Sequence, residues 1–377
     1  MMTFFLLYGG MHLYAFLKAR AAFAFSTMTG IGVAFFMLVM IFAPVIVRVS
    51  EKADFEVIAR ILSYIGYTWL GVLFLFISAS AGLDLYRLVI YACGLLLKKD
   101  LAYLTPGAQY AFFIPLIVAS AVAVYGYFEA RNIHTETILI KSRKIPADVG
   151  RLRIVQISDV HLGLIVREER LNRIVREVMK ANPDILVSTG DLVDGQINNL
   201  SGLAEILRDI NPRYGKFAIT GNHEFYAGLA QAAAFTEKAG FRMLRNEGVM
   251  VEGLINIAGV DDPQVKASSR FNNISEAELL SGLANGQFTV LLKHRPLVDK
   301  SAAGLFDLQL SGHVHKGQIF PFSLITALYY HPVQAGFSEL PSNSHLYISR
   351  GSGTWGPPLR FLSPPEVTVI DLVHNDE

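Results

Sequence analysis

The sequence predicts a chain of two parts, an N-terminal multi-span α-helical membrane domain followed by a soluble α/β domain. Its mean hydropathy of +0.38 is too high for a wholly soluble protein. Residues 1 to 130 carry 14 Lys, Arg, Asp and Glu side chains, whereas residues 131 to 377 carry 51. In the second part, strand patterns alternate with helical patterns, which is typical of an α/β fold.

Four apolar runs in the first part could each cross the roughly 30 Å hydrocarbon core of a bilayer as a helix. A signal peptide is the alternative for the first run, but it lacks a basic start and a small-residue cleavage site. The third run is either one long helix or a shorter one with an extension. The runs extend approximately over Met1–Leu17, Thr27–Val47, Phe55–Leu97 and Tyr110–Phe128.

These runs predict a domain organisation and an orientation. We expect a four-helix transmembrane domain over 1–130, a linker over 131–150 and the soluble domain over 151–377. Four crossings would put the N-terminus and the soluble domain on one side, which has seven Lys and Arg against five on the other. That difference favours a cytoplasmic soluble domain of an integral protein in a bacterial inner or plasma membrane.

Composition restricts the partners and the kind of site. Membrane lipid is an expected partner, whereas the net charge of +1 gives no electrostatic case for nucleic acid. Cys93 is the only cysteine, so the sequence predicts no intrachain disulfide and no thiolate metal site. The oligomeric state is left open.

The soluble domain begins with a predicted inner sheet. Buried strands are expected over Arg151–Ser158, Asp184–Thr189 and Lys216–Thr220, with an amphipathic helix over Arg167–Ala181 after the first. Later β-rich segments predict a second group of strands packed on this one: Gly248–Val260, Phe288–Leu292, Leu308–Leu310, His345–Ser349 and Val367–Leu372.

Polar side chains of metal-ligand type follow several of the predicted strands. Because strand ends meet at one edge of a sheet, we expect these segments to form one site. Their oxygen and nitrogen donors suit Mn, Zn or Fe better than Ca. On extended backbone, the two-residue spacing in D-x-H and H-x-H would point both side chains the same way. The segments are Asp159–Gly163, Thr189–Asp194, Thr220–Glu224, Lys293–Pro296 and Gly312–His315.

In this order, the motifs D-x-H, G-D-x-x-D, G-N-H-E, H-x-P and G-H-x-H resemble those of the calcineurin-like metallophosphoesterases, over residues 150 to 373. The resemblance implies a sandwich of two β-sheets flanked by helices. The segments Gly312–Gln318 and Ser349–Arg360 are similar to those of a membrane-associated branch. That branch includes enzymes that split the diphosphate of UDP-2,3-diacylglucosamine.

The resemblance also implies a role for each motif residue. His223 would be an acid outside the metal ligands that either protonates the leaving oxygen or supports the phosphoryl group, a role near neutral pH that suits an imidazole. Asp191 would bridge two divalent ions (Mn, Zn or Fe), as in sites for phosphoryl transfer. The first ion would also take Asp159, His161 and His315, and the second Asn222, His294 and His313.

Residues beside the motifs allow alternatives. Asp194 and Glu224 are expected to cap or brace the backbone and not to bind metal. Arg350 either contacts a substrate phosphate or packs the glycine-rich turn beside it. Lys293 and Arg295 flank His294 where the family commonly has small or neutral residues, and they could favour a more anionic phosphate or lie in solvent.

Together these features predict a membrane-bound dinuclear-metal phosphoesterase that acts on a phosphodiester or diphosphate bond. Its partner would be a phosphorylated amphiphilic substrate, such as UDP-2,3-diacylglucosamine. One alternative is a non-catalytic membrane scaffold or sensor, but such a relative would have lost a ligand residue and this chain has lost none. A transporter with a regulatory soluble domain is a third interpretation.

Overall fold

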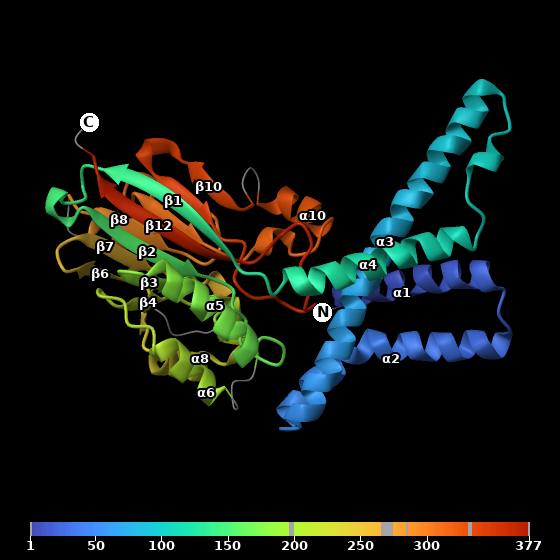
Figure 1. Ribbon diagram of the computed structural model, residues 1–377, viewed down its shortest axis with the longest axis horizontal. Helices are drawn as coiled ribbons and strands as arrows, with labels where there is room; N and C mark the ends of the chain where they lie inside the picture. Colours follow the sequence, from blue (N-terminus) through green and yellow to red (C-terminus); the bar gives the residue numbers. More distant parts are fainter. Residues whose placement is uncertain (1, 196–199, 265–273, 284–285, 331–333, 376–377) are drawn as a thin grey trace. The chain divides into compact units, whose positions relative to one another are not determined.

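The computed structural model describes residues 2–195, 200–264, 274–283, 286–330 and 334–375. The chain divides into two compact units. One, here called the helical unit, comprises residues 1–128 and 356–359. The other, called the α/β unit, comprises residues 129–355 and 360–377. Figure 1 labels the main helices and strands of both units.

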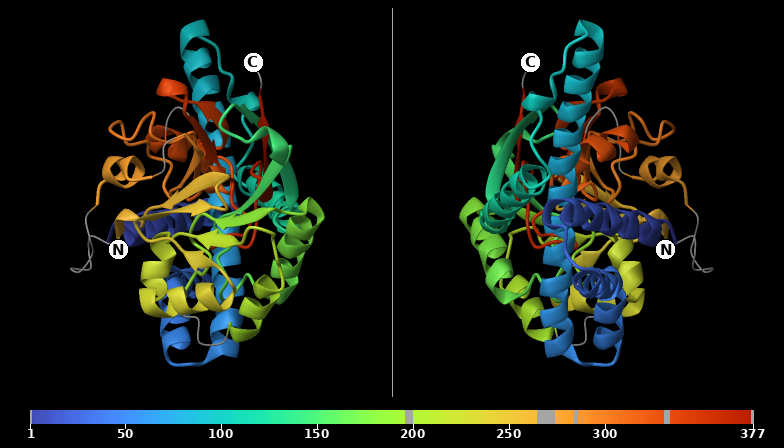
Figure 2. Two further views of the ribbon diagram at one scale, coloured as in Figure 1. Left: turned by 90° about the vertical axis from the view of Figure 1, so that its left-hand side faces the viewer. Right: turned by 90° about the vertical axis from the view of Figure 1, so that its right-hand side faces the viewer.

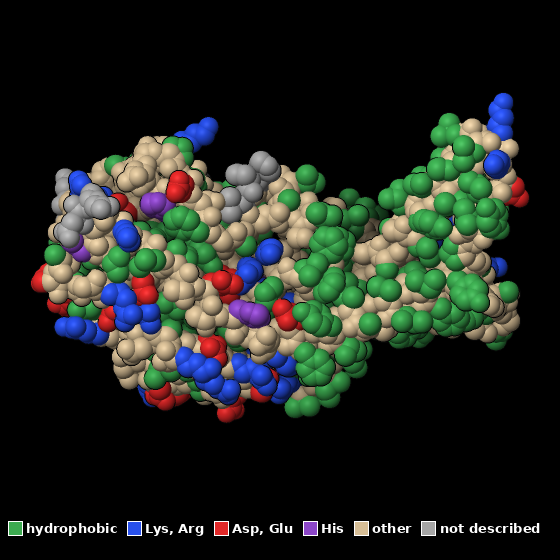
Figure 3. All heavy atoms as spheres, turned by 45° about the horizontal axis from the view of Figure 1, so that its top comes forward, with side chains coloured by type: hydrophobic (Ala, Val, Ile, Leu, Met, Phe, Trp, Pro, Cys, Tyr) green, Lys and Arg blue, Asp and Glu red, His purple; other side chains and the backbone are tan. Residues whose placement is uncertain are grey.

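The helical unit contains four long helices over the described residues: α1 (Met2–Phe23), α2 (Thr27–Lys52), α3 (Glu56–Leu97) and α4 (Tyr110–Glu129). Three of them, α2, α3 and α4, are long and apolar enough to cross a membrane, whereas α1 is outside this group. The third apolar run is one helix of 42 residues, about 63 Å long at 1.5 Å per residue. Many hydrophobic side chains are exposed along the helical segments in Figure 3.

Polar side chains inside the helical unit bind one another. His12 is buried, with Nδ1 2.8 Å from the Tyr8 carbonyl oxygen and Nε2 accepting a hydrogen bond from Trp69. The Asp84 carboxylate accepts hydrogen bonds from Tyr14 and Lys18. These partners satisfy groups that would be costly in contact with lipid.

The α/β unit is built on two stacked sheets, each of six strands over the described residues. The first has the order β1 (His134–Ser142), β12 (Glu366–His374), β2 (Arg151–Ile157), β3 (Ile185–Ser188), β4 (Lys216–Ala218) and β5 (Arg242–Met243). The second has the order β10 (Gly336–Glu339), β11 (His345–Ile348), β9 (Leu308–Ser311), β8 (Phe288–Leu292), β7 (Ile255–Gly259) and β6 (Glu247–Val251).

Side chains of both sheets share one core, and helices flank it. Ile154 and Val187 of the first sheet, for example, belong to the same buried cluster as Ile257 and Val290 of the second. Helices α5 (Glu168–Ala181), α6 (Ser201–Arg208) and α8 (Leu229–Lys238) lie beside the first sheet (Figure 2). The predicted two-sheet α/β fold is therefore confirmed.

Two expectations about strands were wrong. Residues 134–142, expected within a linker, form β1, which pairs in parallel with β12 along its whole length. β12, expected in the second group, lies between β1 and β2 in the first sheet. As an edge strand, β1 mixes polar and apolar residues and is buried almost only at Ile140, so its strand signal is weak.

Lys216 in β4 is buried and holds two helix ends. Its Nζ donates hydrogen bonds to the carbonyl oxygens of Leu207 and Ala239, both at 2.9 Å, at the carboxyl ends of α6 and α8. A cation there is favoured by the helix dipoles. Lys216→Met should lower the free energy of unfolding by about 2–4 kcal/mol, because buried carbonyl groups lose their donor.

The measurement is thermal unfolding of the full chain in detergent. Lys238→Met is the matched control, because its ion pair with Glu205 is exposed and such pairs contribute little to stability. Equal midpoints for the two variants would contradict the role given to Lys216.

Candidate metal centre

The predicted site residues follow strand ends of both sheets. Asp159 follows β2 by two residues, and Asp191 follows β3 by three. Asn222 begins α7 (Asn222–Ala227), just after β4, and His294 and His313 each follow the end of β8 or β9 by two residues. Strands β2, β3 and β4 are parallel, as are β8 and β9, so these ends meet at one edge, here called the catalytic edge.

The backbone at this edge is not extended, contrary to the expectation for D-x-H and H-x-H. Asp159, His161, Asp191, His313 and His315 all have left-handed backbone, with φ between 49° and 72°. Such a conformation costs roughly 1–2 kcal/mol for each residue that is not glycine, and strain of this kind is concentrated at functional sites. The paired ligands therefore converge through tight turns.

Glycines let the turns approach the carboxylates. A Cβ on Gly221 would lie 2.2 Å from Asp191 Oδ1, and one on Gly312 would lie 2.2 Å from Asp159 Oδ2. Both distances are far below van der Waals contact. No larger residue fits at either position with the carboxylates where they are.

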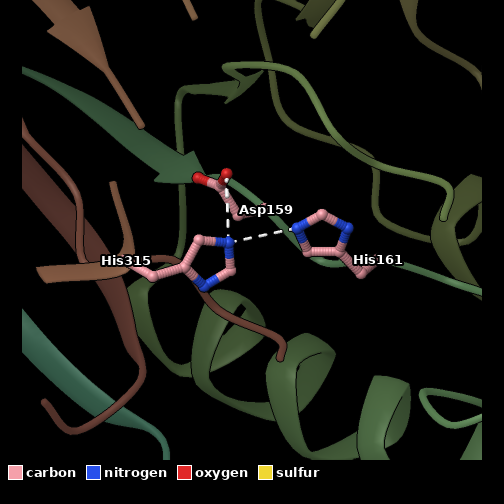
Figure 4. Close-up of side chains that lie close together, drawn as sticks. All are labelled: Asp159, His161 and His315. Carbon is pink, nitrogen blue, oxygen red and sulfur yellow. Dashed lines mark hydrogen bonds and ion pairs between the residues drawn. The ribbon is translucent and has the colours of Figure 1, made fainter. Parts of the chain in front are cut away.

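The first group of potential ligands is Asp159, His161 and His315 (Figure 4). His315 Nε2 lies 3.4 Å from Asp159 Oδ1 and 3.1 Å from His161 Nε2. Asp159 and His161 come from the turn after β2, whereas His315 comes from the turn after β9. Two distant turns thus direct one carboxylate and two imidazoles at one point.

The second group is Asp191, His294 and His313. His294 Nε2 lies 3.2 Å from Asp191 Oδ2 and 3.2 Å from His313 Nδ1. The same oxygen of Asp191 lies 3.9 Å from His161 Nε2, which belongs to the first group. Asp191, a member of the second group, therefore also lies beside the first group.

The described side chains fit divalent metal ions. The Asn222 side-chain oxygen is buried and has no hydrogen-bond partner in the structure, although buried polar atoms rarely lack one. Its neighbour His223 donates its backbone N–H to Asp191 Oδ1 at 2.8 Å, so Asn222 belongs to the same turn region. Carboxylate, amide and imidazole donors together suit a divalent metal ion.

His223 is held by Asp194. His223 Nδ1 lies 2.9 Å from Asp194 Oδ1 and 3.0 Å from the Asp194 carbonyl oxygen. Burial lowers the pKa of His223, but the hydrogen bond to Asp194 and the charges of Asp191 and Asp194 outweigh it and raise the pKa to about 9. Sequence reasoning treated Asp194 as a capping residue and so missed this contact, for which its place in G-D-x-x-D was the available signal.

Glu224 braces the backbone, in line with the expectation. Its carboxylate accepts hydrogen bonds from the backbone N–H groups of Gly221 at 2.6 Å, Asp191 at 3.0 Å and Leu192 at 2.8 Å. Burial and the charge of Asp191 raise the pKa of Glu224. The carboxylate thus ties together the turns that follow β3 and β4.

Arg350 lies in an ion-pair network within the α/β unit. Its Nε is 2.6 Å from Glu366 Oε2, and its guanidinium also pairs with Glu136. This arrangement favours the packing alternative for Arg350 over contact with a substrate phosphate.

Arg360 is fully buried beside the first ligand group, and no motif in the sequence singled it out as a site residue. Its Nη2 lies 3.1 Å from His315 Nδ1 and donates to the carbonyl oxygens of Gly351 at 3.1 Å and Gly353 at 2.7 Å. Burial lowers the pKa of Arg360 to about 9. Arg360 fixes both the His315 ring and the turn that packs against Asp159.

Arg360→Lys should weaken metal binding by about 10–100-fold, as is typical when a residue that orients a ligand is lost. The lysine keeps the charge but cannot make the forked contacts. Metal retained by the full chain after equilibration with graded metal buffers measures the effect. Arg350→Lys is the control, and equal metal affinity in both variants would contradict the role of Arg360.

Comparisons with known proteins agree with this geometry. A family model described as "Calcineurin-like phosphoesterase" matches residues 152–317. An "Uncharacterized metallophosphoesterase" of Aquifex aeolicus is 38% identical over 257 residues, covering 68% of this chain and 98% of the relative. A "Transmembrane protein with metallophosphoesterase domain" of Danio rerio is 32% identical over 271 residues, covering 69% of this chain and 62% of the relative.

Proposed function

Because this chain belongs to the calcineurin-like metallophosphoesterase family, we propose that it is a membrane-bound phosphohydrolase that uses two divalent ions to cleave a phosphodiester or diphosphate bond. The observation that carries the proposal is the place of Asp191, whose Oδ2 lies 3.2 Å from His294 Nε2 and 3.9 Å from His161 Nε2. A carboxylate between two such groups can bridge two ions.

In this proposal, seven residues are metal ligands and one is the general acid. When bound, two divalent ions polarise a phosphoryl group and lower the pKa of water. Asp159, His161 and His315 would hold one ion, and Asn222, His294 and His313 the other, with Asp191 shared. His223 would donate the proton to the leaving oxygen from Nε2, because Nδ1 faces Asp194.

The proposed substrate is an amphiphilic phosphate or diphosphate, such as UDP-2,3-diacylglucosamine. Its support is the presence of α2, α3 and α4, because a long-chain substrate is concentrated in the membrane that such helices would cross. Lys293 and Arg295 lend no support, since they pair with Glu276 at 2.5 Å and Asp262 at 2.8 Å. The bacterial inner or plasma membrane and a cytoplasmic α/β unit are part of this proposal.

The test is turnover by the purified full chain in detergent, with Mn or Zn. The panel contains nitrophenyl phosphate, bis-nitrophenyl phosphate, a nucleoside diphosphate and UDP-2,3-diacylglucosamine, with Asp191→Asn as control. Metal-dependent hydrolysis that the variant lacks would support the proposal. If protein that holds two ions turns over none of these compounds, the non-catalytic scaffold is favoured instead.

A further inference from the structure

The α/β unit starts at its catalytic edge. β1 begins at His134, which pairs with Glu366 at the start of β12. β12 runs antiparallel to β2, with Thr368 opposite Gln156, so the start of β12 lies where β2 ends. Asp159 follows directly after that end. The chain therefore comes from α4 into the α/β unit at the edge that carries the metal ligands.

The connection from α4 is short and fixed. Only residues 130–133 separate the end of α4 from β1, and four residues span at most roughly 15 Å. Arg170 donates to the carbonyl oxygen of Ala130 at 2.8 Å and to Thr354 Oγ1 at 2.7 Å. The neighbouring Gly353 donates its N–H to the carbonyl oxygen of Asp159 at 3.0 Å. The chain thus passes from α4 to the catalytic edge through a connection of only four residues.

Exposed apolar side chains gather at this edge. Helix α10 (Phe322–Tyr329) follows the turn of His315, carries no charge and has no buried residue. Leu324, Leu328 and Tyr329 are 61%, 81% and 76% exposed. Just after the helix, the Tyr330 ring lies 5.9 Å from the ring of His313.

Aromatic side chains extend this apolar surface on the other side of the site. Trp355 and Tyr226 are both more than half exposed, and their rings lie 6.3 Å and 5.3 Å from that of His223. Exposed tryptophan and tyrosine are typical of the membrane–water interface. Exposed apolar patches of this kind mark interaction surfaces. We call α10 together with Tyr226 and Trp355 the apolar rim.

We infer that the apolar rim docks on the lipid surface of the membrane that the chain's own helices cross, so that the metal centre receives its substrate at headgroup level. The inference rests on the proposed function for the identity of the substrate. Docking itself depends only on the short connection and on the rim. Lipid is the occupant we choose, because the connection keeps the catalytic edge within roughly 15 Å of the end of α4.

A fluorescent label tests docking without any measure of activity. In a Cys93→Ser background, the full chain with Leu328→Cys is labelled with NBD and reconstituted in phosphatidylcholine vesicles. Its emission should shift to the blue and be quenched by bromine-labelled acyl chains. Met250→Cys is the control, because Met250 is also 52% exposed but lies in the edge strand β6.

Equal, water-like emission at both positions would overturn the inference. Quenching at position 328 that requires a second labelled chain, and not bromolipid, would overturn it in favour of contact between copies.

A kinetic arm separates docking from catalysis. The double variant Leu324→Gln and Leu328→Gln should hydrolyse nitrophenyl phosphate as the wild type does. On a lipid phosphate in vesicles it should lose about tenfold or more, the factor expected when one buried leucine is lost. If the double variant hydrolyses the lipid phosphate as fast as the wild type does, docking is contradicted. Failure of the wild type on every phosphate would contradict the proposed function instead, while the fluorescence result would still report on docking.

Discussion

Asp191→Asn is expected to abolish phosphoester hydrolysis and to release metal at the same time. The Asp191 carboxylate is buried, with Oδ2 near His294 Nε2 and His161 Nε2. Asparagine has nearly the same shape but no charge, so the ligands of both ions would lose their shared anion. We expect a loss of about 100–1,000-fold in turnover, as for other single groups that stabilise charge in the transition state. Metal analysis and turnover on the same sample measure the two effects.

The matched control is Asp307→Asn, which removes a carboxylate that pairs with Lys144 away from the ligand groups. This variant should keep its metal and its turnover. Two tightly bound ions in Asp191→Asn would refute the bridging role. Loss of secondary structure in Asp191→Asn would be seen by circular dichroism, and we expect none, because the backbone of the turn is held by Glu224.

His223→Ala should keep its metal but lose on the order of a hundredfold in turnover, as expected for a positioned general acid. The loss should shrink for nitrophenyl esters, whose leaving groups need little protonation. An equal loss for leaving groups of widely different pKa would remove the acid role. Initial rates over a series of phosphate esters, with metal content measured in parallel, make the comparison.

Asp194→Asn tests whether Asp194 raises the pKa of His223, the proposed general acid. The hydrogen bond to Asp194 and its charge raise the pKa of His223, so the variant should have a lower pKa at this histidine. The protonated form is the active one, and it is lost as the pH rises through this pKa. The alkaline limb of the pH profile of kcat/KM should therefore move to lower pH. Metal content is measured in parallel, because Asp194 Oδ1 also lies 3.5 Å from His161 Nδ1. An unmoved limb would show that another group titrates there.

The sequence predicted the two-part chain and the α/β fold because both depend on local patterns. Long apolar runs and buried strands with period-two or continuous hydrophobicity are visible in any window of the chain. The strand β1 was missed because an edge strand buries only one side and carries polar residues such as Glu136 and Lys141. The sheet that β12 joins depends on pairing with β1 and β2, which no local pattern encodes.

For the site, the order of the motifs identified the candidate ligands, but the spacing within the motifs did not predict the backbone conformation that brings them together. The seven proposed ligands stand in recognisable motifs, and the structure places six of them in two groups of three within 4.8 Å, with Asn222 in the adjoining turn. The left-handed turns at Asp159 and His315 contradict the extended backbone that the spacing suggested. Arg360 and Asp194 act through residues distant in the sequence, His315 and His223, so their contacts appear only in the folded chain.

Anomalous diffraction from crystals of the full chain grown with Mn or Zn tests the central claim most directly. The account predicts two peaks roughly 3.5–4 Å apart on either side of the Asp191 carboxylate. One peak should lie among Asp159, His161 and His315, and the other beside His294 and His313. A single peak in crystals of fully active protein, or peaks away from Asp191, would contradict it.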